Sequence, residues 1–428
     1  MTRDPAALAT AVVEMARNGR FADIEELFAP PLRAVVSAET LRVEWEGRTS
    51  RIGPISAVGT PVSEPVKTGL VRVSVPVTCE RDGLTVVMSV DEAGLLQGLR
   101  LAPARTASWT PPSYARRKRF DEHDVTVGSG DLAVPGTLSL PHGHGPRPGV
   151  VLLSGGGPFD RDETAGPNKP LKDLAWGLAG RGVAVLRFDK VTHAHADRLA
   201  QDFTMSDEYV PHAVAAVRLL QRHPDVDAAR VYVAGHSMGG KVAPRVAAAE
   251  PSVAGLVLLA GDAQPMHQAA VRVVRHLASL DPGAQAAVEM ITRQAAMVES
   301  PDLSPGTPAA ELLFGYSGAY WLDLRGYDPV AAAAALDKPM LILQGGRDYQ
   351  VTVADDLSRW RAGLADRPDV TIRVYDADDH LFFPGSGPST PADYDSPQHV
   401  DPAVVADIAD WLAPRQGRIT RLVSGFTR

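Results

Sequence analysis

Cysteine is almost absent from this chain. Cys79 is the single cysteine among 428 residues, so no disulfide can form within one molecule. That composition fits a reducing compartment. Because Cys79 lies in VRVSVPVTCE, a stretch that alternates as a β-strand does, we interpret its thiol as a packing group.

Long apolar runs are missing too. No stretch approaches the about 20 apolar residues that a membrane-spanning helix needs. The N-terminal stretch MTRDPAALATAVVEMARNGRF has the pattern of an amphipathic helix, without the apolar core and small-residue cleavage site of a signal peptide. We therefore expect a cytoplasmic protein with no membrane partner.

Positive charge is not in excess. The chain has 43 Lys and Arg residues against 51 Asp and Glu residues, a net charge of −8. Binding to a nucleic-acid backbone requires a basic face, so the composition argues against a nucleic-acid partner. The hydrophobic share of 45% and the charged share of 22% are typical of a soluble globular protein.

Two patterns divide the chain. Residues 1–103 begin with helical periodicity, and then alternate with period two around 40–47, 52–60, 69–80 and 84–94. This order predicts a small α+β domain with helices on an antiparallel sheet. A proline-rich linker with a solvated basic cluster, Arg116–Arg119, is expected over residues 104–119.

The second pattern, over residues 120–415, alternates short apolar strands with helices. The strands include GVVLLSGG, GVAVLRFD, RVYVAGHS, VAGLVLLAG and PMLILQGGRD. Fully apolar strands in this rhythm predict a mostly parallel sheet with helices on both faces. Residues 263–335 lie between two strands, are largely helical, and are too long for a plain crossover, so we expect a cap insertion. Residues 416–428 are expected to form a C-terminal tail.

The stretch VYVAGHSMGGKVAPRV ends an apolar strand in glycines around Ser237. The G-x-S-x-G pattern alone is weak, but Asp348 and His380 each follow a later predicted strand. The order Ser, Asp, His is the one expected for a serine at a strand-to-helix turn. Because functional side chains gather at the carboxyl ends of parallel strands, we expect these three residues to meet.

These residue types suit acyl transfer. A serine hydroxyl is a weak nucleophile, so His380 would accept its proton and later return it to the leaving group. Asp348 would hold the imidazole in the correct tautomer. The carboxyl groups Asp376, Asp378 and Asp379 are rivals for that role, but they follow the same strand as His380 and are poorly placed to orient it.

An oxyanion hole needs two N–H donors. The N–H of Met238 is one candidate, and Gly156 in VLLSGGGPFDRDE is the other. Gly157 in the same loop is a candidate for the pocket wall. Residues Asp160–Asp162 either order this loop through an internal ion pair or face the pocket, and the sequence leaves both options open.

The predicted cap contains FGYSGAYWLDL, which places Tyr316, Tyr320 and Trp321 on roughly one helical face. Such a stripe is either core or the lining of an acyl pocket. His193 and His195 alternate without the carboxylate or cysteine partners of a metal site. We expect no metal and no cofactor.

Taken together, GHSMGG, LLSGGGPFDRDETAGPNKP, DLAWGLAGRGVAVLRFDK, PMLILQGGRDYQV and DHLFFPGSGPSTPADY resemble α/β-hydrolases of the dienelactone-hydrolase and prolyl-oligopeptidase-like branch. Relatives usually have His-Gly where this chain has Ser154-Gly155. Residues 1–103 resemble the small cystatin-like or nuclear-transport-factor-like domain that precedes some of these hydrolases. The resemblance implies the α/β-hydrolase fold and the catalytic triad.

We therefore expect a serine hydrolase that acts on a small-molecule carboxylic ester or thioester through an acyl-enzyme. One alternative is a biosynthetic enzyme that uses the same triad for acyl transfer, cyclisation or elimination. Another is a binding module on an inactive hydrolase fold, against which the complete triad argues. Residues 1–103 are expected either to pair two protomers in a homodimer or to cover the site from the side.

Overall fold

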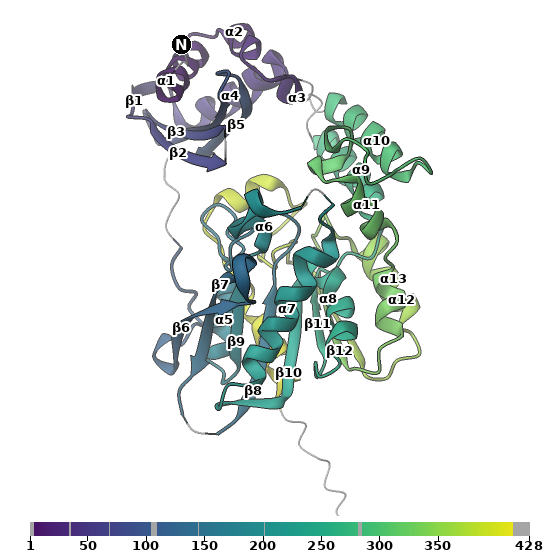
Figure 1. The fold of residues 1–428 in the computed structure, drawn as a ribbon. Coiled ribbons are helices and arrows are strands. Elements are labelled where there is room, and N and C mark those ends of the chain that lie inside the picture. The colour runs from purple at the N-terminus through teal and green to yellow at the C-terminus, as the bar shows by residue number, and fades with distance from the viewer. Residues whose placement is uncertain are drawn as a thin grey trace, which may run out of the picture.

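An eight-stranded sheet with the order β13-β12-β11-β10-β8-β9-β7-β6 forms the centre of the larger part of the molecule (Figure 1). The computed structural model describes residues 4–33, 36–67, 69–103, 109–143, 145–200, 202–280 and 285–413. The strands are β6 (Phe120–Val127), β7 (Val134–Pro141), β8 (Arg147–Leu153), β9 (Ala184–Phe188), β10 (Val226–His236), β11 (Leu256–Leu259), β12 (Met340–Gly345) and β13 (Val370–Tyr375).

Every pairing from β9 to β13 is parallel, whereas β7 runs antiparallel to both β6 and β9. The register of β10 places Gly235 beside Leu153 of β8 and Leu258 of β11. The carboxyl ends of the central strands therefore lie at one edge of the sheet. The mostly parallel α/β fold predicted from the strand pattern is confirmed.

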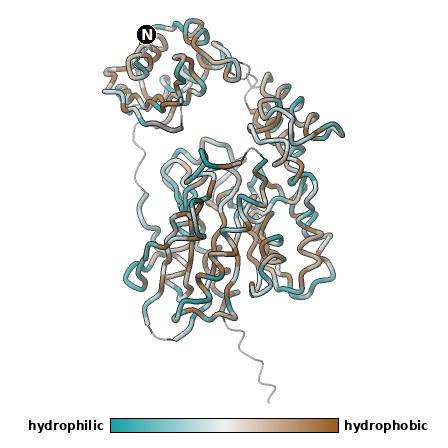
Figure 2. Tube along the Cα trace, in the orientation of Figure 1, coloured by the Kyte–Doolittle hydropathy of each residue, from teal (hydrophilic) through white to brown (hydrophobic). Residues whose placement is uncertain are grey.

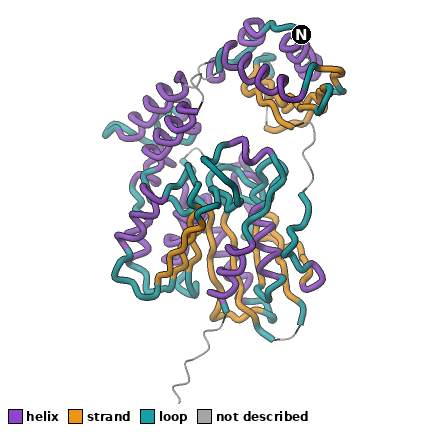
Figure 3. The backbone as a smooth tube through the Cα atoms, turned by 180° about the vertical axis from the view of Figure 1, so that it is seen from behind, coloured by secondary structure: helices purple, strands orange, loops and turns teal. Residues whose placement is uncertain are grey.

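Helices lie on both faces of this sheet (Figure 3), and its strands include many hydrophobic residues (Figure 2). Their side chains form one apolar core on each face. Along β8, Val151 and Leu153 belong to the core on one face, and Val150 and Leu152 to the core on the other. This alternation explains why the strand is apolar throughout. The α-helices that follow strands of this sheet, apart from those of the insertion described below, are α5 (Pro170–Ala179), α6 (Val191–Ala194), α7 (Met205–Gln221), α8 (Met238–Ala249), α13 (Ser358–Gly363) and α14 (Pro402–Leu412).

The chain between β11 and β12 forms a helical insertion. It contains α9 (Met266–Leu280), α10 (Gln285–Glu299), α11 (Gly318–Arg325) and α12 (Pro329–Ala334). Helices α9 and α10 pack side by side and α12 packs on α8, so the insertion is anchored to the helix that follows Ser237 (Figure 1).

The N-terminal elements form a separate antiparallel sheet with its own core. Cys79 is 5% exposed within that core, as expected of a packing residue. The elements are α1 (Pro5–Arg17), α2 (Phe21–Glu26), α3 (Pro30–Arg33), α4 (Ala38–Ile52), β1 (Ile55–Val58), β2 (Val62–Lys67), β3 (Leu70–Cys79), β4 (Gly83–Asp91) and β5 (Leu96–Pro103).

One strand predicted in this region is wrong, because residues 40–47 lie within helix α4. Ser37 caps the helix by accepting from the N–H of Thr40. Leu41 and Trp45 are buried four residues apart, which is helical spacing, and Arg42 pairs with carboxylates three residues before and four after it. Side-chain pairs and capping outweigh the alternating pattern here.

The predicted linker is part of the packed structure from residue 109 onward. Trp109 stacks edge-on against Trp176 of α5 at 4.9 Å between ring centroids, and its Nε1 donates to Asp173 at 2.8 Å. Arg117, expected in solvent, lies over the rings of Phe120 and Trp176. Residues 104–108 and the predicted tail 416–428 lie outside the described residues.

An ion pair joins the two parts of the molecule. Arg48 of α4 lies 3.4 Å from Asp395, in the segment that follows β13. Within the described ranges, no helix combines the length and the hydropathy that crossing a membrane requires.

The packing of Trp109 generates a stability prediction. Trp109→Ala should lower the free energy of unfolding by about 2–3 kcal/mol, because it removes a ring contact and leaves the fully buried Asp173 with one fewer donor. Trp109→Phe, which keeps an aromatic ring but not the indole N–H, should lose about 1 kcal/mol. Urea denaturation followed by circular dichroism measures both, and an unchanged midpoint for Trp109→Ala would contradict this packing role.

Candidate active site

Ser237 occupies a sharp turn between β10 and α8. Its backbone lies at φ 52° and ψ −120°, a conformation that non-glycine residues rarely adopt. The turn requires glycine two residues before and two residues after Ser237. A Cβ on Gly235 would lie 2.1 Å from the carbonyl oxygen of Gly239, and a Cβ on Gly239 would lie 2.5 Å from that of Leu153. The G-x-S-x-G pattern is therefore a steric requirement of this turn.

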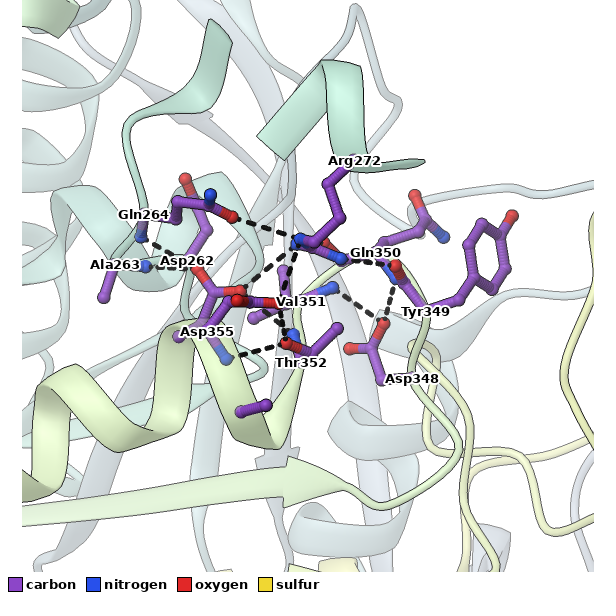
Figure 4. A network of polar contacts seen from close by, with 12 residues as sticks. Asp262, Ala263, Gln264, Arg272, Asp348, Tyr349, Gln350, Val351, Thr352 and Asp355 are labelled. Carbon is purple, nitrogen blue, oxygen red and sulfur yellow. Dashed lines mark hydrogen bonds and ion pairs between the residues drawn. The ribbon is translucent and has the colours of Figure 1, made fainter. Parts of the chain in front are cut away.

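Asp348 and His380 meet as the sequence predicts. Nδ1 of His380 lies 2.7 Å from Oδ2 of Asp348, and both side chains are buried. The loop after β12 holds the carboxylate in place, because Oδ1 of Asp348 accepts from the N–H groups of Gln350 and Val351 at 2.8 and 2.9 Å (Figure 4). The acid is thus fixed as an acceptor that faces the histidine.

A cavity of about 730 Å³ lies beside the candidate nucleophile and the candidate base. Ser237 and His380 both line it, although no hydrogen bond joins the serine hydroxyl to the ring within the part of the chain described. Catalytic hydrogen bonds are often long without a substrate. The rest of the wall is mainly apolar and includes Pro158, Phe159, Met266, Ala269, Ala270, Val273, Phe314, Val351 and Leu381.

The insertion contributes to this cavity differently from the prediction. Gly157 of the glycine-rich loop lines the cavity, and so does Tyr316 of the insertion. Tyr320 and Trp321 of the insertion do not, so these two predicted pocket residues were wrong. Tyr320 is 4% exposed, and its hydroxyl donates to Glu208 of α7. Trp321 is fully buried and donates to the carbonyl of Leu313. Both side chains point from α11 into the core rather than into the cavity.

Helix α9 provides lining residues that the sequence analysis missed. Met266, Ala269, Ala270 and Val273 follow the spacing i, i+3, i+4, i+7 and face the cavity. The signal was present as an apolar stripe on one face of the predicted cap. What the sequence could not indicate is which face of the cap turns toward Ser237.

Two backbone N–H groups at the cavity wall are candidates for an oxyanion hole. Gly156 and Met238 both line the cavity, and their N–H groups have no hydrogen-bond partner among the residues described. The N–H of Met238 lies in the first turn of α8, where helical N–H groups lack an acceptor. These groups can receive developing negative charge on an oxygen.

Behind the nucleophile lies an ion pair that sequence reasoning missed. His236 contacts the Glu163 carboxylate through Nδ1 and the carbonyl of His380 through Nε2, both at 2.9 Å. Burial acts to lower the pKa of His236, but the Glu163 carboxylate, the His380 carbonyl and the Asp348 carboxylate together outweigh it and raise the pKa. His236 thus joins the glycine-rich loop to the loop of His380.

Residues Asp160–Asp162 order the loop rather than face the ligand. Arg161 forms an ion pair with Asp189 at 2.9 Å, and Asp162 forms one with Arg187 at 2.8 Å. None of residues 160–162 lines the cavity. Of the two options left open by the sequence, ordering of the loop is confirmed, but the ion pairs run to Arg187 of β9 and to Asp189 after it rather than within residues 160–162.

A second polar network fixes the insertion to the loop of the candidate acid (Figure 4). Arg272 of α9 donates to the carbonyls of Tyr349 and Gln350 at 2.9 and 2.8 Å. Asp356 accepts from the N–H groups of Ala263 and Gln264 at the start of the insertion. The position of the cavity wall and that of Asp348 are therefore mechanically linked.

His193 and His195 point to different carbonyl groups, those of Pro158 and Ala133. Within the described ranges, no group of three or more His, Cys, Asp and Glu side chains is arranged to hold a metal ion.

The chain is similar to known hydrolases. Residues 169–384 match the family model Hydrolase_4, described as serine aminopeptidase, S33. Esterase EstD of Thermotoga maritima is 36% identical over 334 residues, which are 78% of this chain and 77% of EstD.

Among solved structures, Est1E of Butyrivibrio proteoclasticus is 16% identical with a TM-score of 0.44, over 68% of this chain and 99% of that one. The Pyrococcus furiosus esterase Pf2001 is 18% identical with a TM-score of 0.44, over 73% of this chain and 97% of that one. Structural similarity at this level adds nothing to the family match.

A carboxyl group with an unusual pKa adjoins His380. Asp378 is fully buried, and burial together with the carboxylates of Asp401 and Asp379 raises its pKa to about 7. The folded protein therefore binds this proton more tightly than the unfolded chain does. Between pH about 4 and about 7, this group makes the free energy of unfolding fall as the pH rises.

Asp378→Asn should remove that loss of stability. The variant should have a higher Tm than the wild type at pH 8, with a smaller advantage at pH 5, where the native carboxyl is largely protonated. Differential scanning calorimetry at both pH values measures this, with the exposed neighbour Asp376→Asn as the control. An Asp378→Asn variant destabilised equally at both pH values would contradict the assignment.

Proposed function

The chain belongs to the serine aminopeptidase S33 family (Hydrolase_4), whose members are hydrolases, and from that premise we propose that it hydrolyses carboxylic esters with Ser237 as the nucleophile. The observation that carries the proposal is that His380 lines the same cavity as Ser237 and is hydrogen-bonded through Nδ1 to the buried carboxylate of Asp348 behind the wall. The three residues follow three different parallel strands, β10, β12 and β13, of one sheet.

The proposed reaction has two halves. In the first, Ser237 Oγ attacks the ester carbonyl, His380 accepts the hydroxyl proton, and the N–H groups of Gly156 and Met238 bind the oxyanion. Collapse of the intermediate breaks the bond to the alcohol, which takes the proton from His380. In the second half, water attacks the acyl-enzyme, with His380 again as the base, and releases the acid and free Ser237.

Asp348 would support both halves without changing its own protonation. Its Oδ2 faces Nδ1 of His380 at 2.7 Å, which places the ring proton on Nδ1 and leaves Nε2 free to accept one. When His380 becomes an imidazolium, the same carboxylate stabilises the positive charge.

The composition of the cavity wall supports uncharged substrates. None of the described lining residues is lysine or arginine. Of the acidic ones, Glu163 is held by His236 and Asp262 by Lys241. The stripe on α9 and the rings of Phe314 and Tyr316 offer an apolar surface for an acyl chain.

The comparisons support ester hydrolysis over the other reactions considered. A relative named as an esterase matches more than three quarters of the chain. Nothing in the structure or the comparisons favours acyl transfer, cyclisation or elimination. The family description also names an aminopeptidase, so an aminoacyl p-nitroanilide belongs in the same assay as an ester.

Replacing the nucleophile tests this function. Ser237→Ala should lower kcat for p-nitrophenyl butyrate by about 10⁴-fold or more, because the acyl-enzyme can no longer form. It should also lose labelling by a fluorophosphonate probe, whereas Ser252→Ala, in the turn beyond the C-terminal end of α8, should label like the wild type. Wild-type labelling or turnover in Ser237→Ala would refute the proposal.

Substrate charge gives a second prediction. The p-nitrophenyl ester of succinic acid, whose free carboxylate would be buried without a partner, should have a kcat/KM at least about 10-fold below that of its methyl ester. The two substrates have nearly the same length, so the comparison isolates the charge. Equal kcat/KM values would show that the cavity wall does not select against an anion.

A further inference from the structure

A buried lysine behind the glycine-rich loop has no part in the mechanism above. Lys190 lies two residues after the end of β9 and is 3% exposed. Its Nζ lies 3.0 Å from the carbonyl oxygen of Gly155, 2.7 Å from the hydroxyl of Tyr209 and 2.9 Å from the carboxylate of Glu208. An ammonium group has three N–H donors, so these three acceptors satisfy it completely.

Tyr209 of α7 provides a second donor to the same carbonyl. Its hydroxyl accepts from Lys190 and donates to the carbonyl oxygen of Gly155 at 2.7 Å. Burial raises the pKa of Tyr209 well above its usual range, so the hydroxyl keeps its proton at neutral pH. The Gly155 carbonyl thus accepts two hydrogen bonds, one for each of its lone pairs.

The N–H group of Gly155 is hydrogen-bonded as well. Its N–H donates to Oε1 of Glu163 at 2.7 Å, and Glu163 is paired with His236. Three consecutive glycines would otherwise leave this loop a wide choice of backbone conformations. The loop is therefore ordered from outside, by buried charged and hydroxyl groups.

This anchoring decides where the next N–H points. The peptide bond between Gly155 and Gly156 is trans, so its C=O and N–H groups point in opposite directions. The carbonyl points to Lys190 and Tyr209, neither of which lines the cavity, while Gly156 does line it. We propose that Lys190 and Tyr209 are positioning residues that aim the Gly156 N–H at the oxyanion, an inference that rests on the proposed function.

The insertion is joined to this anchor. The hydroxyl of Tyr320 in α11 donates to Glu208 and lies 3.5 Å from the sulfur of Met238. Glu208 is the carboxylate that pairs with Lys190. The orientation of the oxyanion donors thus depends on contacts from α7, from the end of β9 and from the insertion.

Tyr209→Phe tests the inference in the full-length enzyme, because it removes one hydroxyl and keeps the ring. We expect kcat for p-nitrophenyl butyrate to fall about 10-fold, less than the 10²–10³-fold lost when an oxyanion donor is removed outright. KM should stay within about twofold. The affinity for a trifluoromethyl ketone, whose adduct has a tetrahedral oxyanion, should fall by the same factor as kcat.

Two further variants separate positioning from general damage. Lys190→Met combined with Glu208→Gln removes the ammonium without leaving a lone buried carboxylate, and should change kcat and ketone affinity in the same direction. Thr192→Val removes a 2.7 Å hydrogen bond to Glu208 but no contact with Gly155, and should match the wild type within about twofold.

The outcomes distinguish this inference from the proposed function. If Tyr209→Phe keeps wild-type kcat and ketone affinity, or if Thr192→Val loses as much, the positioning role is wrong while Ser237 can remain the nucleophile. If Ser237→Ala hydrolyses the ester like the wild type, the proposed function itself fails. Should the double variant not fold, Tyr209→Phe alone decides.

Discussion

The close approach of three backbone segments around Ser237 is the constraint on which the rest of the site depends. The end of β8, the turn after β10 and the first turn of α8 are so close that a Cβ on Gly239 would meet the carbonyl of Leu153 at 2.5 Å. A Cβ on Gly155 would lie 3.2 Å from the Cβ of Ser237. This contact brings the hydroxyl and the two free N–H groups to one wall of one cavity.

Buried charge holds the loops that glycine alone would leave free. Glu163 with His236 and Lys190 with Glu208 are pairs of nearly inaccessible side chains within hydrogen-bond distance. Removing two charges from water costs as much as their attraction returns, so such pairs are a poor source of stability. Here both pairs fix the position of the glycine-rich loop, because Glu163 accepts from the N–H of Gly155 and Lys190 donates to its carbonyl.

Much of the fold and the order of the candidate triad could be predicted, because both depend on local patterns. Apolar strands predict the parallel part of the sheet, and each candidate residue lies in the segment just after a strand. The Glu163–His236 pair joins residues 73 positions apart, with Glu163 in a loop at φ 54°, and no local pattern marks it. The direction of Tyr320 was missed for the same reason, because helical spacing places side chains on one face without saying what that face meets.

The most direct test of this account is a crystal structure of the enzyme after reaction with a fluorophosphonate ester. We predict a covalent bond from phosphorus to Ser237 Oγ, with the phosphoryl oxygen within hydrogen-bond distance of the N–H groups of both Gly156 and Met238. A bond to another residue, or a phosphoryl oxygen directed away from these two groups, would contradict it.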